Sequence, residues 1–302
     1  MFRRHAFRRR WLGGGLSTLI GLVPAASHAA PTDVYYERAL MSAANQRCNL
    51  FSPELGSALE SAAAQARGAA LRAGAASQTV AQVGQNARWR AAQTPCNAPD
   101  LAVAAGRVRA AFDGYAHLQS MTFPGDVTFW RAQRSTAMRT MTWRLFQSAN
   151  FGQDSLTFGL AGRGEASGLI VAAHFADNAQ PYAARLVMRD AARAPAPFIG
   201  GFSQAGRTGL AAHMPMRAAT SVFPAEARAD ADQSLLPAGA TSGLAFRFPR
   251  AAIDVLATLD PRESVAIEFL LVEGRAGDGV RTAYIEVGDF AAGRAFLAAA
   301  QR

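Results

Sequence analysis

Two cysteines, Cys48 and Cys96, constrain this chain of 302 residues more than any other feature. Both stand shortly before the same local pattern, which is Pro53-Glu54-Leu55 after the first cysteine and Pro99-Asp100-Leu101 after the second. Proline at the first helical position, followed by an acid in the first turn, is typical of a helix start. Two cysteines in an exported chain are expected to pair. The sequence therefore predicts a disulfide that ties two helix starts together.

The first 29 residues have the parts of a secretory signal peptide. Arginines crowd the start, an apolar run extends from Trp11 to Ala26, and Ser27-His28-Ala29 supplies a small-residue exit. The run is too short and too interrupted by glycine to span a bilayer comfortably. We expect cleavage after Ala29 and a periplasmic or secreted mature protein. Arg8-Arg9-Arg10 also fits a twin-arginine signal, so the choice between the Sec and Tat routes stays open.

The high net charge of +9 belongs largely to this leader. All 31 basic residues are arginines, and removal of the leader leaves 26 of them against 22 acids, a net charge of +4. A nucleic-acid interface needs a concentrated basic face with interleaved aromatic residues. Arg88-Trp89-Arg90 is only one local cluster of that kind. The sequence thus argues against nucleic acid as a partner and predicts no transmembrane span after cleavage.

Residues 30–120 predict an α-helical domain, because apolar side chains recur at helical spacing. Ser52 is a good N-cap, Gly74 a plausible C-terminal stop, and Pro95 ends a later helix. Ser77 is expected to cap the third helix. The expected helices are 33–48, 53–71, 78–93 and 99–118. Helices two and three are similar in length, so an up-down arrangement brings Cys48 and Cys96 to the same end of the bundle.

One resemblance attaches to this region. Cys96-Asn97-Ala98-Pro99-Asp100-Leu101, with Phe112 and Tyr115 further along the helix, is similar to the repeated helix starts of the LprI-type lysozyme-inhibitor domain. It covers about 20 residues, and Gly106 stands where that pattern has an aspartate. The resemblance implies an exported, disulfide-tied helical module, with inhibition of a secreted lytic enzyme as one alternative function.

Residues 121–140 are interpreted as a joint between two domains, since Pro124-Gly125 is a strong turn signal. Phe129, Trp130 and Arg131 follow the turn. They predict either aromatic residues wedged between the domains or an exposed surface for a protein or envelope partner.

Residues 141–302 change to an alternating pattern with turn signals about ten residues apart, which favours antiparallel strands. We expect a β-rich, sandwich-like domain with a C-terminal helix capped by Asp289, and hence a two-domain α+β fold. A polar surface loop is expected over 224–240. The other expected elements are strands at 141–146, 156–160, 169–171, 182–188, 209–213, 217–223, 244–248, 265–272 and 280–287 and a short helix at 249–259.

One phrase looks catalytic. Gly201-Phe202-Ser203-Gln204-Ala205 resembles the nucleophile elbow of carboxylesterase-like α/β-hydrolases, which implies Ser203 as nucleophile and the Gln204 amide as an oxyanion donor. In that fold an acid and then a histidine follow the serine. Here the last histidine, His213, comes only ten residues later, too soon for an intervening acid strand. A glycine turn between strands is therefore the preferred interpretation, with a serine hydrolase as an alternative.

No cofactor or metal site is predicted. The mature chain has three histidines, His117, His174 and His213, and they lack metal-ligand spacing. The function most consistent with these observations is a non-catalytic, exported protein that binds a ligand or an envelope partner.

Overall fold

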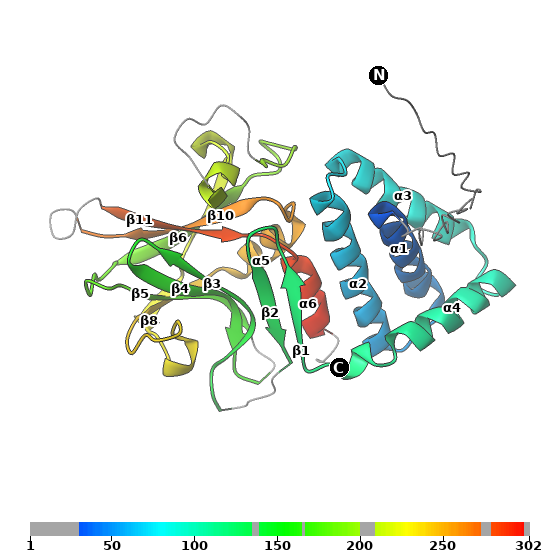
Figure 1. Cartoon of the computed structure of the whole chain (residues 1–302), viewed down its shortest axis with the longest axis horizontal. Coiled ribbons are helices and arrows are strands. Elements are labelled where there is room, and N and C mark those ends of the chain that lie inside the picture. The colour runs from blue at the N-terminus through cyan, green and yellow to red at the C-terminus, as the bar shows by residue number, and fades with distance from the viewer. Residues whose placement is uncertain (1–29, 135–138, 165–166, 200–208, 273–278, 299–302) are drawn as a thin grey trace, which may run out of the picture.

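The computed structural model describes residues 30–134, 139–164, 167–199, 209–272 and 279–298. Helices occupy the N-terminal part and two antiparallel sheets the rest, so the α+β class is confirmed (Figure 1). The four N-terminal helices are α1 (Pro31–Cys48), α2 (Pro53–Arg72), α3 (Ser77–Gln93) and α4 (Pro99–Phe112).

The helix starts follow the local sequence signals with one exception. The Ser52 hydroxyl accepts a hydrogen bond from the Leu55 amide at 3.4 Å, and Pro53 opens α2 as predicted. Gly74 takes a left-handed φ of 92° just after α2, where a side chain would be strained. The prediction that Ser77 caps α3 is wrong. Ala76 is the N-cap, and the Ser77 hydroxyl instead donates to Asp260 at 2.9 Å.

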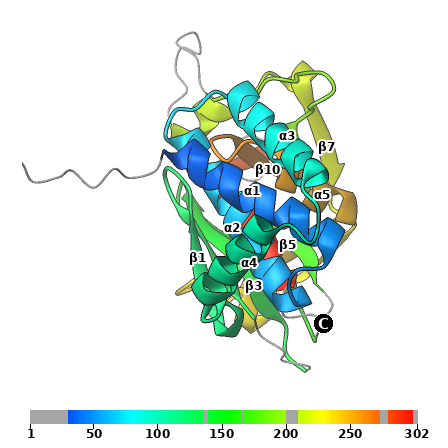
Figure 2. The ribbon, with the colours of Figure 1, turned by 90° about the vertical axis from the view of Figure 1, so that its right-hand side faces the viewer.

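The predicted disulfide between Cys48 and Cys96 is confirmed, with a Cα–Cα distance of 5.5 Å. Helix α1 packs against both α2 and α3. Helix α4 packs across the end of the bundle where the disulfide lies (Figure 2). The fourth helix ends earlier than predicted, at Phe112, and a 3₁₀ turn, η1 (Tyr115–His117), follows it.

Eleven strands in the described residues form two sheets. The larger sheet has the order β1-β2-β3-β4-β5-β9-β8, and the smaller has the order β11-β10-β6-β7. Every pair of neighbours is antiparallel. The strands are β1 (Ser120–Pro124), β2 (Phe129–Gln133), β3 (Thr142–Phe151), β4 (Asp154–Gly162), β5 (Gly168–His174), β6 (Ala183–Arg189), β7 (Thr220–Pro224), β8 (Ala227–Asp230), β9 (Leu244–Phe248), β10 (Ser264–Leu270) and β11 (Val280–Glu286).

The main core lies between the two sheets. Phe158 and Phe246 of the larger sheet and Ile267 and Phe269 of the smaller sheet belong to one buried cluster, and each is 0 % exposed. At the centre of the larger sheet, Gly159 has a φ of 153°, and a Cβ there would lie 1.9 Å from the Leu145 carbonyl oxygen. Glycine is therefore required where the β3–β4 register shifts.

The segment interpreted as a joint belongs to the larger sheet. β1 and β2 pair as a hairpin, and β2 continues the sheet by pairing with β3. Phe123 and Trp130 from this hairpin are both 0 % exposed and part of the main core. Alternation along these short strands fixes which side chains face inward, and that burial makes 120–133 part of the β-rich unit rather than a linker.

Two further expectations differ from the structure. The expected strand at 209–213 is a 3₁₀ turn, η2 (Gly209–His213). The expected surface loop at 224–240 contains β8 and a further 3₁₀ turn, η4 (Gln233–Leu235). Leu235 from that turn is buried against Trp143, whose indole N–H donates to the Leu235 carbonyl at 3.2 Å. The loop thus covers the outer face of the larger sheet.

Two helices close the β-rich part, α5 (Arg250–Thr258) and α6 (Phe290–Ala298). Helix α6 lies between the hairpin and α2, so it joins the helical and β-rich parts (Figure 1). The Ser61 hydroxyl of α2 donates to the Ala292 carbonyl of α6 at 2.8 Å. Arg72 holds Asp289 by two hydrogen bonds, at 2.7 and 2.9 Å, at the start of α6.

Candidate functional site

The predicted interaction surface at Phe129, Trp130 and Arg131 is divided by the pleat of β2. Phe129 is 42 % exposed, and the Arg131 guanidinium lies over its ring, 5.0 Å from the centroid. Trp130 points the other way, and its indole N–H donates to the Val287 carbonyl at 2.8 Å. The expectation of an exposed surface is therefore wrong for Trp130, which is a core residue, while Phe129 and Arg131 face outward.

Ser203 lies outside the described residues. The next histidine in the sequence, His213, which follows too soon for the hydrolase order, is described, and its Nδ1 is 2.8 Å from the Arg262 carbonyl oxygen. A carbonyl oxygen can only accept, so Nδ1 is the donor, and in the neutral ring Nε2 is then the nitrogen that carries the lone pair. This tautomer is the one that a general base requires.

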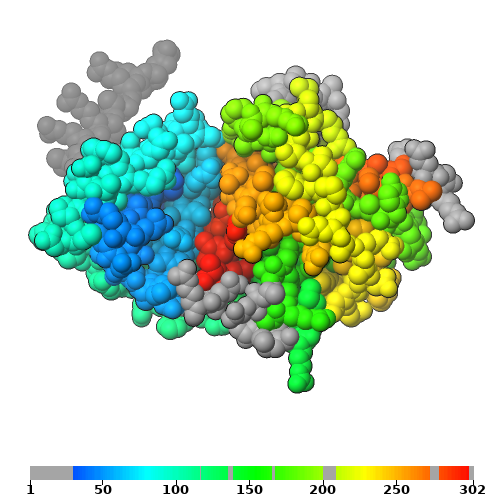
Figure 3. All heavy atoms as spheres, turned by 180° about the vertical axis from the view of Figure 1, so that it is seen from behind, coloured from blue at the N-terminus to red at the C-terminus, as the bar shows by residue number. Residues whose placement is uncertain are grey.

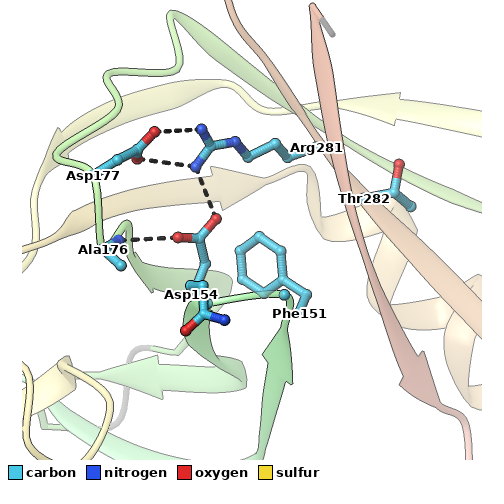
Figure 4. Close-up of a pocket in the computed structure, with 8 residues that line it drawn as sticks. Phe151, Asp154, Ala176, Asp177, Arg281 and Thr282 are labelled. Atoms are coloured by element: carbon cyan, nitrogen blue, oxygen red, sulfur yellow. Dashed lines mark hydrogen bonds and ion pairs between the residues drawn. The ribbon is translucent and has the colours of Figure 1, made fainter. Parts of the chain in front are cut away.

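The first candidate pocket is a hollow of about 590 Å³ at one end of the β-sandwich, lined by Phe151, Asp154, Asp177 and Arg281. Figure 4 shows that Asp177 and Arg281 face each other, and that Asp154 reaches the same guanidinium. The bonds from Arg281 to Asp177 are 2.6 and 3.0 Å long, and its bond to Asp154 is 2.9 Å long. The other oxygen of Asp154 accepts from the Ala176 amide at 2.9 Å.

The charged groups of this hollow are occupied with one another. The hydrogen bond from Arg281 lowers the pKa of Asp177 from 3.8 to about 2. The bond to Asp177 raises the pKa of Arg281, and the neighbouring Asp154 contributes in the same direction. The three side chains connect β4, the loop after β5 and β11, so they clamp the two sheets together. A ligand would find few free donors or acceptors here.

A second hollow, of about 690 Å³, lies where β4, β5 and β9 meet α5 and α6. Three arginines line it, Arg247 from β9, Arg250 from α5 and Arg294 from α6, together with one acid, Glu226. We call it the arginine hollow. Figure 3 shows α5 in orange beside α6 in red on this face of the molecule. Its volume is within the range of small-molecule sites, about 300–1,000 Å³.

The arginines of this hollow are weakly neutralised. No hydrogen bond or ion pair joins Arg250 to another described residue. Arg247 Nε is 3.9 Å from the Glu226 carboxylate, and both side chains are more than half exposed, at 58 % and 51 %. Arg294 forms an ion pair with Asp254, with 2.8 Å between Nη2 and Oδ1. Exposed pairs of this kind contribute little stability, so these guanidiniums can bind an anion at low cost.

The backbone holds two of these arginines in place. Arg247 lies opposite Ile170 in the β5–β9 ladder, and its side chain crosses Gly168, where a Cβ would be 3.6 Å from its Cδ. Pro249 then turns the chain and serves as the N-cap of α5, so that Arg250 is the first helical residue. The phrase Arg247-Phe248-Pro249-Arg250 was the available sequence signal for this site. Nothing local linked it to Arg294, which comes from a different helix.

A third hollow, of about 480 Å³, lies beside the disulfide between α1, α3 and α4. Met41, Ala91 and Leu101 supply apolar walls, and Arg90 and Asp100 lie among the lining residues. The lining residues include one charge of each sign, so the groove has no electrostatic preference comparable to that of the arginine hollow.

Two further features are absent from the described residues. They contain no cluster of three or more histidine, cysteine, aspartate or glutamate side chains that could hold a metal ion. None of their helices has both the length and the apolarity of a membrane span.

Comparison of the chain with protein-family models, curated proteins and solved structures gives no match.

Proposed function

We propose that the mature chain is an exported, non-catalytic binding protein that holds a small anionic ligand in the arginine hollow. The observation that carries the proposal is Arg250, a guanidinium on the hollow that has no partner among the described residues. Arg247 and Arg294 add positive charge from two other elements. A carboxylate or phosphate oxygen bound there would gain charge-assisted hydrogen bonds, which are about twice as strong as neutral ones.

The proposed compartment is the periplasm or the exterior of the cell. The basic and apolar leader at residues 1–29 supports export, and the Cys48–Cys96 disulfide supports an oxidising environment.

The test is calorimetric titration of the mature protein, residues 30–302, with inorganic phosphate and with hexanoate at fixed ionic strength. We expect binding of at least one anion, weakened about tenfold or more in Arg250→Ala, because a hydrogen bond to a charged group contributes about 1.5–3 kcal/mol. The matched control is Arg107→Ala, which removes an exposed arginine from α4, an element that contributes nothing to the hollow. Equal affinities in the two variants would reject the site.

A serine hydrolase is the second candidate, favoured by one observation. The Arg262 carbonyl holds His213 in the tautomer that leaves Nε2 free to accept a proton. A fluorophosphonate probe applied to the mature protein and to Ser203→Ala decides between the two functions. Labelling that is lost in the variant would show an activated serine and overturn the non-catalytic proposal, whereas we expect no labelling in the folded protein.

The third interpretation, an inhibitor of a secreted lytic enzyme, stays a prediction. It depends on the short resemblance around Cys96, and the family comparison adds no support to it.

A further inference from the structure

The polar and apolar residues of the arginine hollow are separated by depth. Its apolar side chains are almost fully buried, with exposed fractions of 4 % for Leu160, 2 % for Phe248, 9 % for Ile253 and 7 % for Leu297. Its charged side chains are far more exposed, at 58 % for Arg247 and 39 % for Arg294. The hollow therefore has charged groups at its rim, above an apolar floor formed by the small accessible parts of core side chains.

The size of the hollow exceeds the needs of a bare oxyanion. Its volume of about 690 Å³ is many times the roughly 30 Å³ that one water molecule takes in the liquid. A phosphate or acetate ion would occupy a small part of that space and would leave the floor in contact with water. A ligand that fills the hollow needs an apolar portion as well as a charge.

The charge of the rim sets the charge of the ligand head. Three arginines, Arg247, Arg250 and Arg294, stand against two carboxylates, Glu226 in the lining and Asp254 paired with Arg294, which leaves a formal charge of +1. One negative charge on the ligand balances this excess. Arg250 is the natural contact for it, since the other two arginines already have acidic neighbours at 3.9 and 2.8 Å.

We propose that the ligand is a single-chain amphiphile with a monovalent carboxylate head, bound with its head at Arg250 and its alkyl chain on the apolar floor. This inference rests on the proposed function, which requires only that an anion binds. Long arginine side chains suit such a site, because their apolar stems can pack beside the chain while their guanidiniums stay at the rim.

The experiment titrates the mature protein with acetate, butanoate, hexanoate and octanoate at one ionic strength, all far below micelle formation. We expect affinity to rise about fourfold for each methylene that reaches the floor, because burial of a CH₂ contributes about 0.8 kcal/mol. Octyltrimethylammonium, which has a similar chain and a cationic head, should not bind. Arg250→Ala should weaken octanoate about tenfold or more, and Arg107→Ala should leave it unchanged.

The outcomes separate the two proposals. Binding of acetate, phosphate and octanoate with the same affinity would overturn the amphiphile and leave the anion-binding function standing. Binding that grows with chain length but ignores Arg250→Ala, or that extends to octyltrimethylammonium, would also overturn the amphiphile, because the chain would then be held elsewhere. Absence of binding by every anion would overturn both proposals. The chain-length series uses the unaltered protein, so it does not depend on how a variant folds.

Discussion

At the scale of single residues, several side chains stabilise contacts between segments that are far apart in the sequence. The Cys48–Cys96 disulfide joins the end of α1 to the segment after α3. Arg281 links the two sheets through Asp154. Arg72 of α2 holds Asp289 at the start of α6, and so links the helical part to the β-rich part. The sequence shows that these residues are charged or are cysteines. It does not show which residue each one contacts, except for the cysteine pair.

Removal of the disulfide should be costly. The bond closes a separation of 48 residues, which corresponds to about 4 kcal/mol in the chain-entropy model. We expect the double variant Cys48→Ser/Cys96→Ser to unfold at a clearly lower urea concentration than the oxidised protein. The reduced natural protein is the matched control and should resemble the variant. A midpoint unchanged by both treatments would show that the bundle does not depend on the bond.

The ion pair between Asp177 and Arg281 should make stability depend on acid. The folded pKa of Asp177, about 2, lies below its ordinary value of 3.8. Its contribution is therefore fully present above pH 3.8 and is lost as the pH falls through 2. We expect the difference in thermal midpoint between the natural protein and Asp177→Asn to shrink over that interval. A difference that is constant from pH 6 to pH 2 would contradict the ion pair.

At the scale of elements, α2 and α6 form the main joint of the molecule. Gly68 of α2 allows this close packing, because a Cβ at this position would lie 1.9 Å from Asp289 Oδ1. Burial raises the pKa of Asp289, and the bonds from Arg72 oppose that rise without cancelling it. The Asp289 carboxylate thus lies against α2 with Arg72 as its counter-ion.

Arg72→Met should destabilise the protein by about 3–5 kcal/mol, because it leaves a buried carboxylate without its counter-ion. The side chains of Arg72 and Asp289 are 12 % and 1 % exposed. Adding Asp289→Asn to the first change should restore part of the loss, since the buried charge is then gone. Urea unfolding of the four proteins measures this coupling, and strict additivity of the two changes would mean that the pair is not coupled.

At the scale of the whole molecule, the β-rich part begins near residue 119 and not at residue 141. The hairpin β1–β2 completes the larger sheet, and its inward side chains Phe123 and Trp130 contact the same core as α6. The helical part then covers α6 from the other side through α2. The helical part and the β-rich part therefore meet in one interface, formed by α2 on one side and α6 on the other.

Two fragments test that boundary. A fragment of residues 119–302 keeps the hairpin, and a fragment of residues 141–302 lacks it and so loses two large core aromatics. We expect the longer fragment to resist protease and to show near-ultraviolet dichroism of fixed aromatic side chains, and the shorter one to lose both properties. Equal behaviour of the two fragments would support a true linker over 121–140.

The sequence alone determined the features that depend on near neighbours. Ser52 and Pro53 start a helix by capping it, Gly74 ends one, and the alternating pattern of 141–302 defines strands, because each signal acts within a few residues. The disulfide followed from two cysteines and helix lengths. The short hairpin at 120–133 was missed because its proline and glycine read as a break.

Tertiary structure alone decided everything that depends on distant partners. The buried side of Trp130, the bond from Ser77 to Asp260 and the packing of α2 on α6 each join segments over a hundred residues apart. The arginine hollow has the same origin, since β9, α5 and α6 bring Arg247, Arg250 and Arg294 to one place. Local propensity carries no information on such contacts, because their free energy comes from burial and charge pairing that exist only once the chain has folded.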